Sequence, residues 1–517
     1  MSDSAAISSR REFLGTAASF GAAVGLWACA RPSPPNILVC ISDDQSHPHA
    51  SAYGSKFVDT PAFDRVAREG VLFTNAFSPS PGCSPTRAAF LTGQHDWRIE
   101  NAGTHASSFP AKFATYPDLL EQAGYWIGYT GKPWGPGNWE EERPRNPAGA
   151  EFNEVEADPP ASGIRNRDYA ANFQSFLDQR PEGKRFCFWF GCHEPHRRFE
   201  KGSGLAAGKQ LDDVEVPPFL PDREEIRSDM LDYALEIEHF DTHLSRILET
   251  LERAGEIDNT LIIVTSDNGM AFPRAKANCY EYGIHMPLAI RWGGRVPPGR
   301  TVDDLIGFVD LTATILDAAG VAHPEPAELS GRSIVDLLTS DGEGVVDESR
   351  DAVYSARERH SSSRYNNWTY PQRSLRTRDY LYIRNFKSDR WPAGDPQKYG
   401  EEGELEAMHD AYQDIDASPS KTFLIENRDD PEIGRFFRLA VDKRPAEELF
   451  DIRVDPGCLD NLAIKPEHEQ TRRDLAEKLE AYLRATGDPR VVGDGDVWET
   501  YKRYSPIRSF PEPPDSL

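Results

Sequence analysis

Cysteine is sparse in this sequence, and the cysteines present form no framework. Seven are scattered over 517 residues, without a C-x-x-C pair or a histidine-rich spacing of the kind that binds zinc. Cys29 lies in an N-terminal segment that resembles an export signal, and Cys83 has a setting that suggests chemistry, which leaves five others. An odd and dispersed set excludes a disulfide framework as the basis of the fold.

Positive charge is also in short supply. The chain carries 58 Lys and Arg residues against 84 Asp and Glu residues, a formal net charge of -26. Nucleic-acid binders neutralise phosphates with basic patches, so this balance argues against a nucleic-acid partner. If the substrate is an anion, a local group of cations must attract it, because the field of the whole chain repels it.

Long apolar runs are absent, and the one weakly apolar segment lies at the N-terminus. Residues 15–30 are rich in Ala and Gly and are too short for a membrane-spanning helix. They follow a twin-arginine pattern at Arg10 and Arg11. This pattern predicts an export signal over residues 1–30 that the twin-arginine translocase reads. We therefore expect a periplasmic or extracellular protein.

The predicted signal has two competing processing sites. A small-x-small peptidase site covers residues 28–30, whereas residues 26–29 resemble a lipobox apart from Trp27. The first interpretation gives a soluble mature chain, and the second gives a lipid anchor on Cys29. The sequence leaves both open.

Apolar runs alternate with helical patterns over the first two thirds of the chain. Residues 36–42 are typical of a buried parallel strand, and a helical pattern over 61–69 closes at Gly70. Such alternation predicts an α/β fold in which helices sandwich a large mixed, mostly parallel sheet. We expect further strands at 125–129, 185–190, 260–265 and 287–291, and further helices at 225–254 and 309–319.

The pattern of predicted elements changes after about residue 345, where the apolar runs become shorter. Short strand-like runs appear at 351–354, 380–383 and 447–451, and a helical pattern covers about 467–486. They predict a smaller C-terminal α+β domain with an antiparallel sheet. The expected organisation is a catalytic domain at 34–345, a C-terminal subdomain at 346–505 and a loosely ordered Pro-rich tail at 506–517.

Residues 83–87 read Cys-Ser-Pro-Thr-Arg and precede an apolar helical pattern. Pro85 falls in the first turn of that helix, where a missing backbone N–H costs nothing. A group on Cys83 would then face the free N–H groups of a helix start, which favour anions, and Arg87 adds a permanent cation. A small buried cysteine at a helix entry is the simpler interpretation, so the rest of the chain must decide.

Polar pairs follow two of the predicted strands. Asp43 and Asp44 end the first strand, and Asp267 and Asn268 follow the strand at 260–265. The carboxyl ends of parallel strands meet at one edge of a sheet, where ligands bind. Asp and Asn are common strand terminators, but carboxylate and amide oxygens together are what a hard divalent cation prefers. The two pairs jointly predict a metal site.

Three further loops carry Lys132, His196 and Lys276. Each residue alone is more often a solvated surface group. If the three converge on one crevice with a cation and a helix start, they form a cradle for an anion.

Together these segments resemble the type I sulfatases of the alkaline-phosphatase-like superfamily. The run at 83–87 with Leu-Thr-Gly at 91–93 looks like the family signature. Segments similar to the family's first metal pair, lysine loop, histidine loop, second metal pair and part of its C-terminal domain occur at 36–44, 130–132, 193–196, 265–269 and 447–463. Such joint matching over nearly the whole chain beyond the signal is highly specific.

The resemblance implies a modified residue and a metal. Cys83 would be oxidised to formylglycine (3-oxoalanine) by a formylglycine-generating enzyme or an anaerobic sulfatase-maturating enzyme, and the hydrate would carry the nucleophilic oxygen. One calcium ion per chain would be held by that residue together with Asp43, Asp44, Asp267 and Asn268.

The resemblance also implies roles for the remaining polar residues. Arg87 would support the hydrate. Lys132, His196 and Lys276 would hold the sulfate oxygens, with His196 or Lys276 as the general acid for the leaving group. The segment at 271–276 resembles the heparan N-sulfatase branch, and we prefer Lys276 to Arg274 as its sulfate-binding cation.

Two positions depart from the family pattern. Thr86 stands where serine is usual, and both side chains carry a hydroxyl. Trp134 stands where many members have a histidine near the hydrate, which leaves the catalytic base unassigned. The candidates for that base are His47, His95 and His105.

The C-terminal domain offers candidates for specificity. The runs at 357–360 and 370–373 contain charged residues that, exposed near the mouth of the site, would recognise a sugar carboxylate or a second sulfate. Glu358, His360 and Arg373 are the expected substrate-binding residues there, and a solvated surface loop is an equal alternative.

The sequence therefore predicts an exported sulfatase that hydrolyses sulfate esters of a sulfated oligo- or polysaccharide. Three alternatives stay open. They are an N-sulfoglucosamine sulfohydrolase (sulfamidase) that cleaves N–S bonds, a phosphonate or phosphodiester hydrolase of the same superfamily, and a silent glycan-binding protein in which Cys83 is not converted.

Overall fold

The computed structural model describes residues 34–513. The twin-arginine pair and Cys29 lie outside these residues. Beyond Pro34 the described chain forms one compact unit, which contains two sheets. None of its helices combines the length and apolar character needed to cross a membrane.

The larger sheet has nine strands in the order β4-β3-β5-β1-β6-β7-β2-β8, with β9 also paired to β2. Their bounds are β1 (Asn36–Ser42), β2 (Val71–Phe77), β3 (Trp126–Gly131), β4 (Ala150–Glu151), β5 (Phe186–Gly191), β6 (Thr260–Ser266), β7 (His285–Trp292), β8 (Arg300–Val302) and β9 (Ile306–Gly307). Pairing is parallel except where β7 meets β6 and β2. The predicted mixed, mostly parallel sheet is confirmed.

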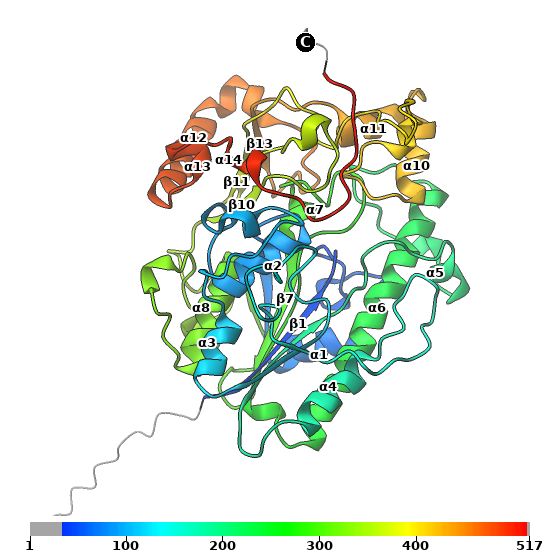
Figure 1. Cartoon of the computed structure of the whole chain (residues 1–517). Coiled ribbons are helices and arrows are strands. Elements are labelled where there is room, and N and C mark those ends of the chain that lie inside the picture. Colours follow the sequence, from blue (N-terminus) through cyan, green and yellow to red (C-terminus); the bar gives the residue numbers. More distant parts are fainter. Residues whose placement is uncertain (1–33, 514–517) are drawn as a thin grey trace, which may run out of the picture. The chain divides into compact units, whose positions relative to one another are not determined.

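Helices cover both faces of this sheet, as Figure 1 shows. Side chains of β1 alternate between two cores: Ile37 and Val39 pack with α2, α3 and α8, whereas Leu38 and Cys40 pack with α1, α4 and α6. The helices are α1 (Pro61–Glu69), α2 (Cys83–Thr92), α3 (Tyr116–Gln122), α4 (Tyr169–Asp178), α5 (Ser203–Ala206), α6 (Glu224–Arg253), α7 (Glu281–Ile284), α8 (Phe308–Ala319), α9 (Val335–Thr339), α10 (Pro419–Glu426), α11 (Gly434–Val441), α12 (Glu469–Ala485), α13 (Pro489–Val492) and α14 (Val497–Thr500).

The smaller sheet has four antiparallel strands in the order β10-β11-β12-β13. They are β10 (Val353–Arg357), β11 (Gln372–Arg376), β12 (Tyr380–Asn385) and β13 (Glu447–Asp451). The antiparallel C-terminal sheet is confirmed, whereas the boundary near residue 345 stays a prediction. The sequence did not indicate β11, because its run Gln-Arg-Ser-Leu-Arg is polar although every residue of it is buried.

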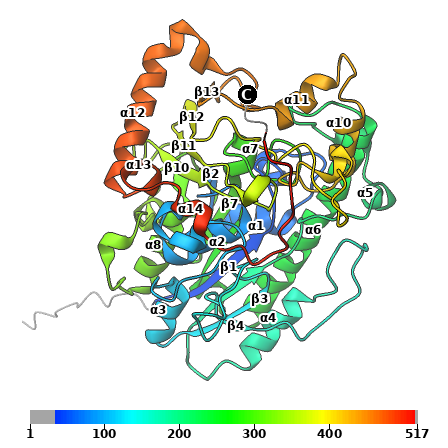
Figure 2. The same ribbon diagram turned by 45° about the horizontal axis from the view of Figure 1, so that its top comes forward.

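The tail, expected to be loosely ordered, makes defined contacts as far as Phe510. Phe510 is 4% exposed, Arg508 N–H donates to Ser362 Oγ at 2.9 Å, and Tyr399 N–H donates to the Ser509 carbonyl at 2.9 Å. The segment after α14, red in Figure 2, also passes the loop that follows α2 and its 3₁₀ turns. There Tyr504 N–H donates to the Ala106 carbonyl at 2.7 Å. Backbone and side-chain contacts thus hold residues 508–510 of this segment.

Candidate active site

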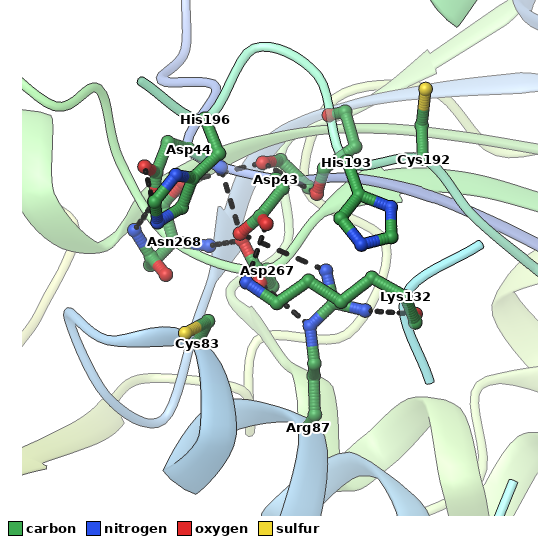
Figure 3. A network of polar contacts seen from close by, with 12 residues as sticks. Asp43, Asp44, Cys83, Arg87, Lys132, Cys192, His193, His196, Asp267 and Asn268 are labelled. Carbon is green, nitrogen blue, oxygen red and sulfur yellow. Dashed lines mark hydrogen bonds and ion pairs between the residues drawn. The ribbon is translucent and has the colours of Figure 1, made fainter. Parts of the chain in front are cut away.

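The ends of β1 and β6 bring the two polar pairs together. These strands are adjacent and parallel with Ser42 opposite Ser266, so the residues that follow them must meet. Asp44 N–H donates to Asp267 Oδ1 at 3.1 Å, and Asn268 Nδ2 donates to Asp44 Oδ1 at 2.7 Å. Figure 3 shows this cluster with its polar contacts.

Helix α2 adds Cys83 to the same cluster. Its sulfur and one carboxylate oxygen each from Asp43 and Asp267 all lie within 4.8 Å of one another. Cys83 is 2% exposed, and burial raises the pKa of its thiol. The signature cysteine therefore lies beside the carboxylates at the first turn of its helix (Figure 3).

The donor set fits a hard cation. Two buried oxygens, Asp43 Oδ1 and Asn268 Oδ1, have no hydrogen-bond partner, which is costly unless something else satisfies them. Burial and the neighbouring charge of Asp43 raise the pKa of Asp267. A divalent ion bound to these oxygens would relieve both the lost hydrogen bonds and the repulsion between carboxylates.

Arg87 and Lys132 balance part of the negative charge. Arg87 Nε donates to Asp267 Oδ2 at 2.8 Å, and its Nη1 donates to the Lys132 carbonyl at 2.6 Å. Lys132 Nζ donates to Asp43 Oδ2 at 2.5 Å. Burial alone would raise the pKa of Asp43, but the cations of Lys132 and Arg87, with His196 and Lys276, hold it well below its usual range. Asp43 is therefore ionised.

Lys276 and His196 contact the cluster on the side of Asp44. Lys276 Nζ donates to Asp44 Oδ2 at 2.6 Å and lies 3.1 Å from Asp416 Oδ2. His196 Nε2 is 3.9 Å from Asp44 Oδ2, and its side chain is 36% exposed. Arg274, in contrast, donates to the backbone carbonyls of Leu439 and Cys458, so it lies outside the cluster.

A cavity of about 750 Å³ opens onto these residues. Its lining includes Asp43, Lys132, His193, His196, Arg165 and Arg198. Burial, with Lys132 as the next cause, lowers the pKa of His193 to about 3, so this ring is neutral. The arrangement offers buried oxygens for a metal, cations for an anion, and a partly exposed histidine at the entrance.

A protein-family model described as Sulfatase matches residues 35–321 of the chain, and one described as N-sulphoglucosamine sulphohydrolase, C-terminal, matches residues 274–426. The chain belongs to the sulfatase family. It is therefore a sulfuric ester hydrolase by descent, and the fold described above is that of its family.

Curated relatives match almost end to end. An ulvan-active sulfatase of Formosa agariphila is 25% identical over 495 residues, covering 92% of this chain and 87% of the relative. The human N-sulphoglucosamine sulphohydrolase is 27% identical over 514 residues, covering 91% and 94%.

Solved structures share the fold. A structure in complex with its substrate D-glucosamine-2-N,6-O-disulfate has a TM-score of 0.61 at 20% identity, covering 88% of this chain and 99% of that one. A 2-O GAG sulfatase has a TM-score of 0.61 at 18% identity, covering 90% and 96%.

Two of the three residues expected to set specificity are not available to a substrate. Arg373 is 0% exposed and donates to Asp488 Oδ2 at 2.6 Å and to Glu358 Oε1 at 2.8 Å. Glu358 is 3% exposed and also accepts from Arg490 Nη2 at 2.7 Å. The expectation that Glu358 and Arg373 lie exposed at the mouth was wrong, because they form a buried ion network that links β11 to the N-terminus of α13.

His360 lies closer to the cluster. Its ring centroid is 4.7 Å from that of His105, and His105 Nε2 is 3.4 Å from Cys83 Sγ. The other two candidate bases point elsewhere: His47 stacks on His285, and His95 contacts Tyr482 Oη at 2.7 Å.

Sequence reasoning assigned no role to Asp416, Arg165 or Arg198. Asp416 comes from the loop before α10 and reaches Lys276 only through the tertiary fold. Arg165 and Arg198 belong to no motif that the sequence shows. Only their position in the lining of the cavity indicates a role for them.

Proposed function

We propose that this chain is an exported sulfatase that hydrolyses sulfate esters of a sulfated carbohydrate, using a formylglycine made from Cys83 and one bound calcium ion. The observation that carries this proposal is the convergence of Cys83 at a helix start with the buried carboxylates of Asp43, Asp44 and Asp267. Relatives named as ulvan-active sulfatase and N-acetylglucosamine-6-O-sulfatase support a carbohydrate substrate.

The absent groups would supply two kinds of chemistry. Asp43, Asp44, Asp267, Asn268 and residue 83 would hold a calcium ion, which would supply Lewis-acid chemistry there. Formylglycine supplies a hydrate whose oxygen is the nucleophile.

The chain's own cations would bind and orient the sulfate. Lys132 and Lys276 carry positive charge into a site that excludes most water, where each charge stabilises an anion more than it would in solution. Arg87 donates hydrogen bonds to Asp267 and to the Lys132 carbonyl. It therefore fixes the positions of these two residues and does not itself contact the substrate. His196 is the general acid, because it is partly exposed at the cavity and can deliver a proton to the leaving alcohol.

Further cations at the cavity favour a substrate with more than one negative group. Arg165 and Arg198 are exposed, and their side chains make no hydrogen bond or ion pair within residues 34–513. They would bind a sugar carboxylate or a second sulfate in place of Glu358 and Arg373. The substrate is therefore an oligo- or polysaccharide with several negative groups rather than a sugar whose only charge is one sulfate.

A sulfamidase is the second candidate. The match of residues 274–426 to the N-sulphoglucosamine sulphohydrolase C-terminal model favours it, as does the human relative. Release of sulfate from a panel of defined saccharides, half with only O-sulfates and half with only N-sulfates, separates the two. A phosphate diester in the same panel tests the phosphodiesterase alternative, and preference for it would overturn the proposal.

Mass spectrometry of the peptide that contains Cys83 tests the nucleophile. Conversion to the aldehyde lowers its mass by about 18 Da relative to the thiol. Cys83→Ala should abolish sulfate release and leave the thermal midpoint close to that of the wild type, since Cys83 is a small side chain at a helix start. An unmodified thiol in native, active protein would contradict the proposed nucleophile. An unmodified thiol in native protein that releases no sulfate would favour the silent glycan-binding alternative.

Export is part of the proposal and rests on Arg10 and Arg11. The twin-arginine translocase carries folded proteins, whereas a maturation enzyme needs the Cys83 segment accessible. Conversion should therefore precede transport, and formylglycine should be present in the cytoplasmic precursor. Partition of the mature chain into detergent, lost on Cys29→Ser, would identify a lipid anchor.

A further inference from the structure

The position where many sulfatases have a histidine is filled here by a side chain that cannot replace it. Trp134 is 2% exposed, and its Nε1 donates to the Ser84 carbonyl at 3.1 Å. Its ring packs edge-on against Phe109 at 5.1 Å. An indole N–H only donates, and this one is already engaged with the backbone of α2. Trp134 therefore supports the first turn of α2 and offers nothing to the substituent of residue 83.

A histidine from another loop contacts that substituent instead. His105 Nε2 is 3.4 Å from Cys83 Sγ. Ala106 N–H donates to Ser84 Oγ at 3.1 Å, which ties the loop to α2. His105 N–H donates to the Arg359 carbonyl at 3.2 Å, and the Ala106 carbonyl accepts from Tyr504 N–H at 2.7 Å. Contacts from both sides thus hold the imidazole against position 83.

The second ring nitrogen of His105 faces a group that can only donate. Arg503 Nη1 is 3.3 Å from His105 Nδ1, and it also donates to the His360 carbonyl at 3.0 Å and to the His105 carbonyl at 3.3 Å. A guanidinium has no acceptor, so we assign Nδ1 as the acceptor of this contact. The proton of the neutral imidazole then lies on Nε2, directed at residue 83.

We propose that His105 donates its Nε2–H to an oxygen of the mature residue 83, and that Arg503 fixes the tautomer in which it can do so. The proposal rests on the proposed function, because Cys83 Sγ stands here for that oxygen. His105 is then a catalytic residue that acts as a hydrogen-bond donor, not as a proton acceptor, and Arg503 is a positioning residue supplied by the C-terminal segment. A fixed donor of this kind orients the side chain of residue 83 and stabilises negative charge on its oxygen.

Replacement of His105 by amides of two lengths separates a donor from a base. The amide nitrogen of Gln can occupy the position of Nε2, whereas the amide of Asn reaches only as far as Nδ1. With kcat normalised to the formylglycine content measured by mass spectrometry, we expect H105A and H105N to lose about a hundredfold to a thousandfold. H105Q should stay within about tenfold of the wild type, because it restores the donor. A loss in H105Q equal to that in H105A, with unchanged thermal midpoints, would overturn the proposal.

Nuclear magnetic resonance reads the tautomer without any catalysis. In protein expressed without a maturation enzyme and labelled with ¹⁵N-histidine, the His105 ring, assigned by its absence in H105Q, should be the Nε2–H tautomer. R503M removes the donor to Nδ1 and should shift the ring toward the other tautomer, whereas R503K, which keeps a donor, should restore the wild-type signal. A wild-type ring in the Nδ1–H form would overturn the proposal.

The same variants distinguish this inference from the proposed function. If wild-type protein with formylglycine releases no sulfate from any ester, the proposed function fails while the tautomer measurement still stands. If the wild type is active, R503M should lower kcat with little change in KM and R503K should recover most of it. Equal activity of R503M and the wild type would remove Arg503 from the inference.

Discussion

At the scale of single residues, the site is a buried balance of opposite charges. Asp43, Asp44 and Asp267 face Arg87, Lys132 and Lys276. Five of these six side chains are buried, and that of Lys132 is 12% exposed. Two oxygens in the middle of this cluster, Asp43 Oδ1 and Asn268 Oδ1, have no hydrogen-bond partner. A bound cation would satisfy these oxygens, in keeping with the proposed calcium site.

Calcium should therefore stabilise the folded protein. A ligand that binds only the native state at a hundred times its Kd adds about 2.7 kcal/mol to the free energy of unfolding. We expect the thermal midpoint to rise with added calcium and to fall with a chelator. Asp43→Asn should remove most of this response, whereas Asp389→Asn, an exposed acid outside the cluster, should keep it. A thermal midpoint that does not change with calcium, together with no heat of binding in calorimetry, would contradict a calcium site.

At the scale of elements, the N-termini of α2 and α13 each hold a cluster of buried polar side chains in place. The first two turns of α2 carry Cys83 and Arg87, and Ser84 holds the loop of His105. The N-cap of α13 is Asp488, which accepts from Arg490 N–H and pairs with Arg373 of β11. The first builds the site, and the second joins the smaller sheet to the C-terminal helices.

Arg373 should therefore matter for stability rather than for substrate binding. Arg373→Met leaves Asp488 buried without its cation, and breaking a buried pair in this way costs about 3–5 kcal/mol. We expect a lower thermal midpoint and a lower denaturation midpoint. Arg378→Met, at a partly exposed ion pair with Glu348, should change the free energy of unfolding by less than about 1 kcal/mol.

The catalytic parameters of the same variant provide the control. Folded Arg373→Met should keep the KM of the wild type for sulfated saccharides at a temperature well below its midpoint. A KM raised tenfold at unchanged stability would restore Arg373 as a substrate-binding residue.

At the scale of the whole molecule, a strongly acidic chain must bind an anion. The net charge of -26 repels a sulfated saccharide at long range, so the cations at the cavity act against the global field. Among the cations that line the cavity, Arg165 and Arg198 are exposed. They lie outside the buried cluster, where carboxylates and cations form ion pairs with one another.

Replacing both arginines should affect polyanionic substrates most. For Arg165→Ala with Arg198→Ala, we expect kcat/KM to fall about tenfold for an oligosaccharide with several sulfates, since each exposed ion pair contributes up to about 1 kcal/mol. For a small substrate with one sulfate, the fall should be under about threefold. Arg435→Ala with Arg484→Ala, two exposed arginines that do not line the cavity, should have no such effect. Equal losses of kcat/KM for both substrates would show that the two arginines do not bind the additional negative groups of the larger substrate.

Much of the fold could be predicted because its signals are local. The strands at 36–42 and 260–265 and the helices at 61–69, 225–254 and 309–319 agree with the structure within one residue at each end. Apolar runs and helical spacing indicate these elements without knowledge of any tertiary contact. The polar strand β11 could not be found in this way, because ion pairs from distant segments, such as that of Arg373 with Asp488, satisfy its buried side chains.

The sequence by itself determined the family and the reactive cluster. Cys83, Arg87 and the polar pairs at 43–44 and 267–268 follow strand ends and a helix start, and parallel strands force such positions to one edge of a sheet. Only the tertiary structure decided the rest. It removed Glu358 and Arg373 from the mouth, added Asp416 beside Lys276, and brought His105 and Arg503 to position 83. The reason is physical: these residues meet through loops and a C-terminal segment far apart in the chain, and no local pattern encodes contacts that depend on how the whole chain folds.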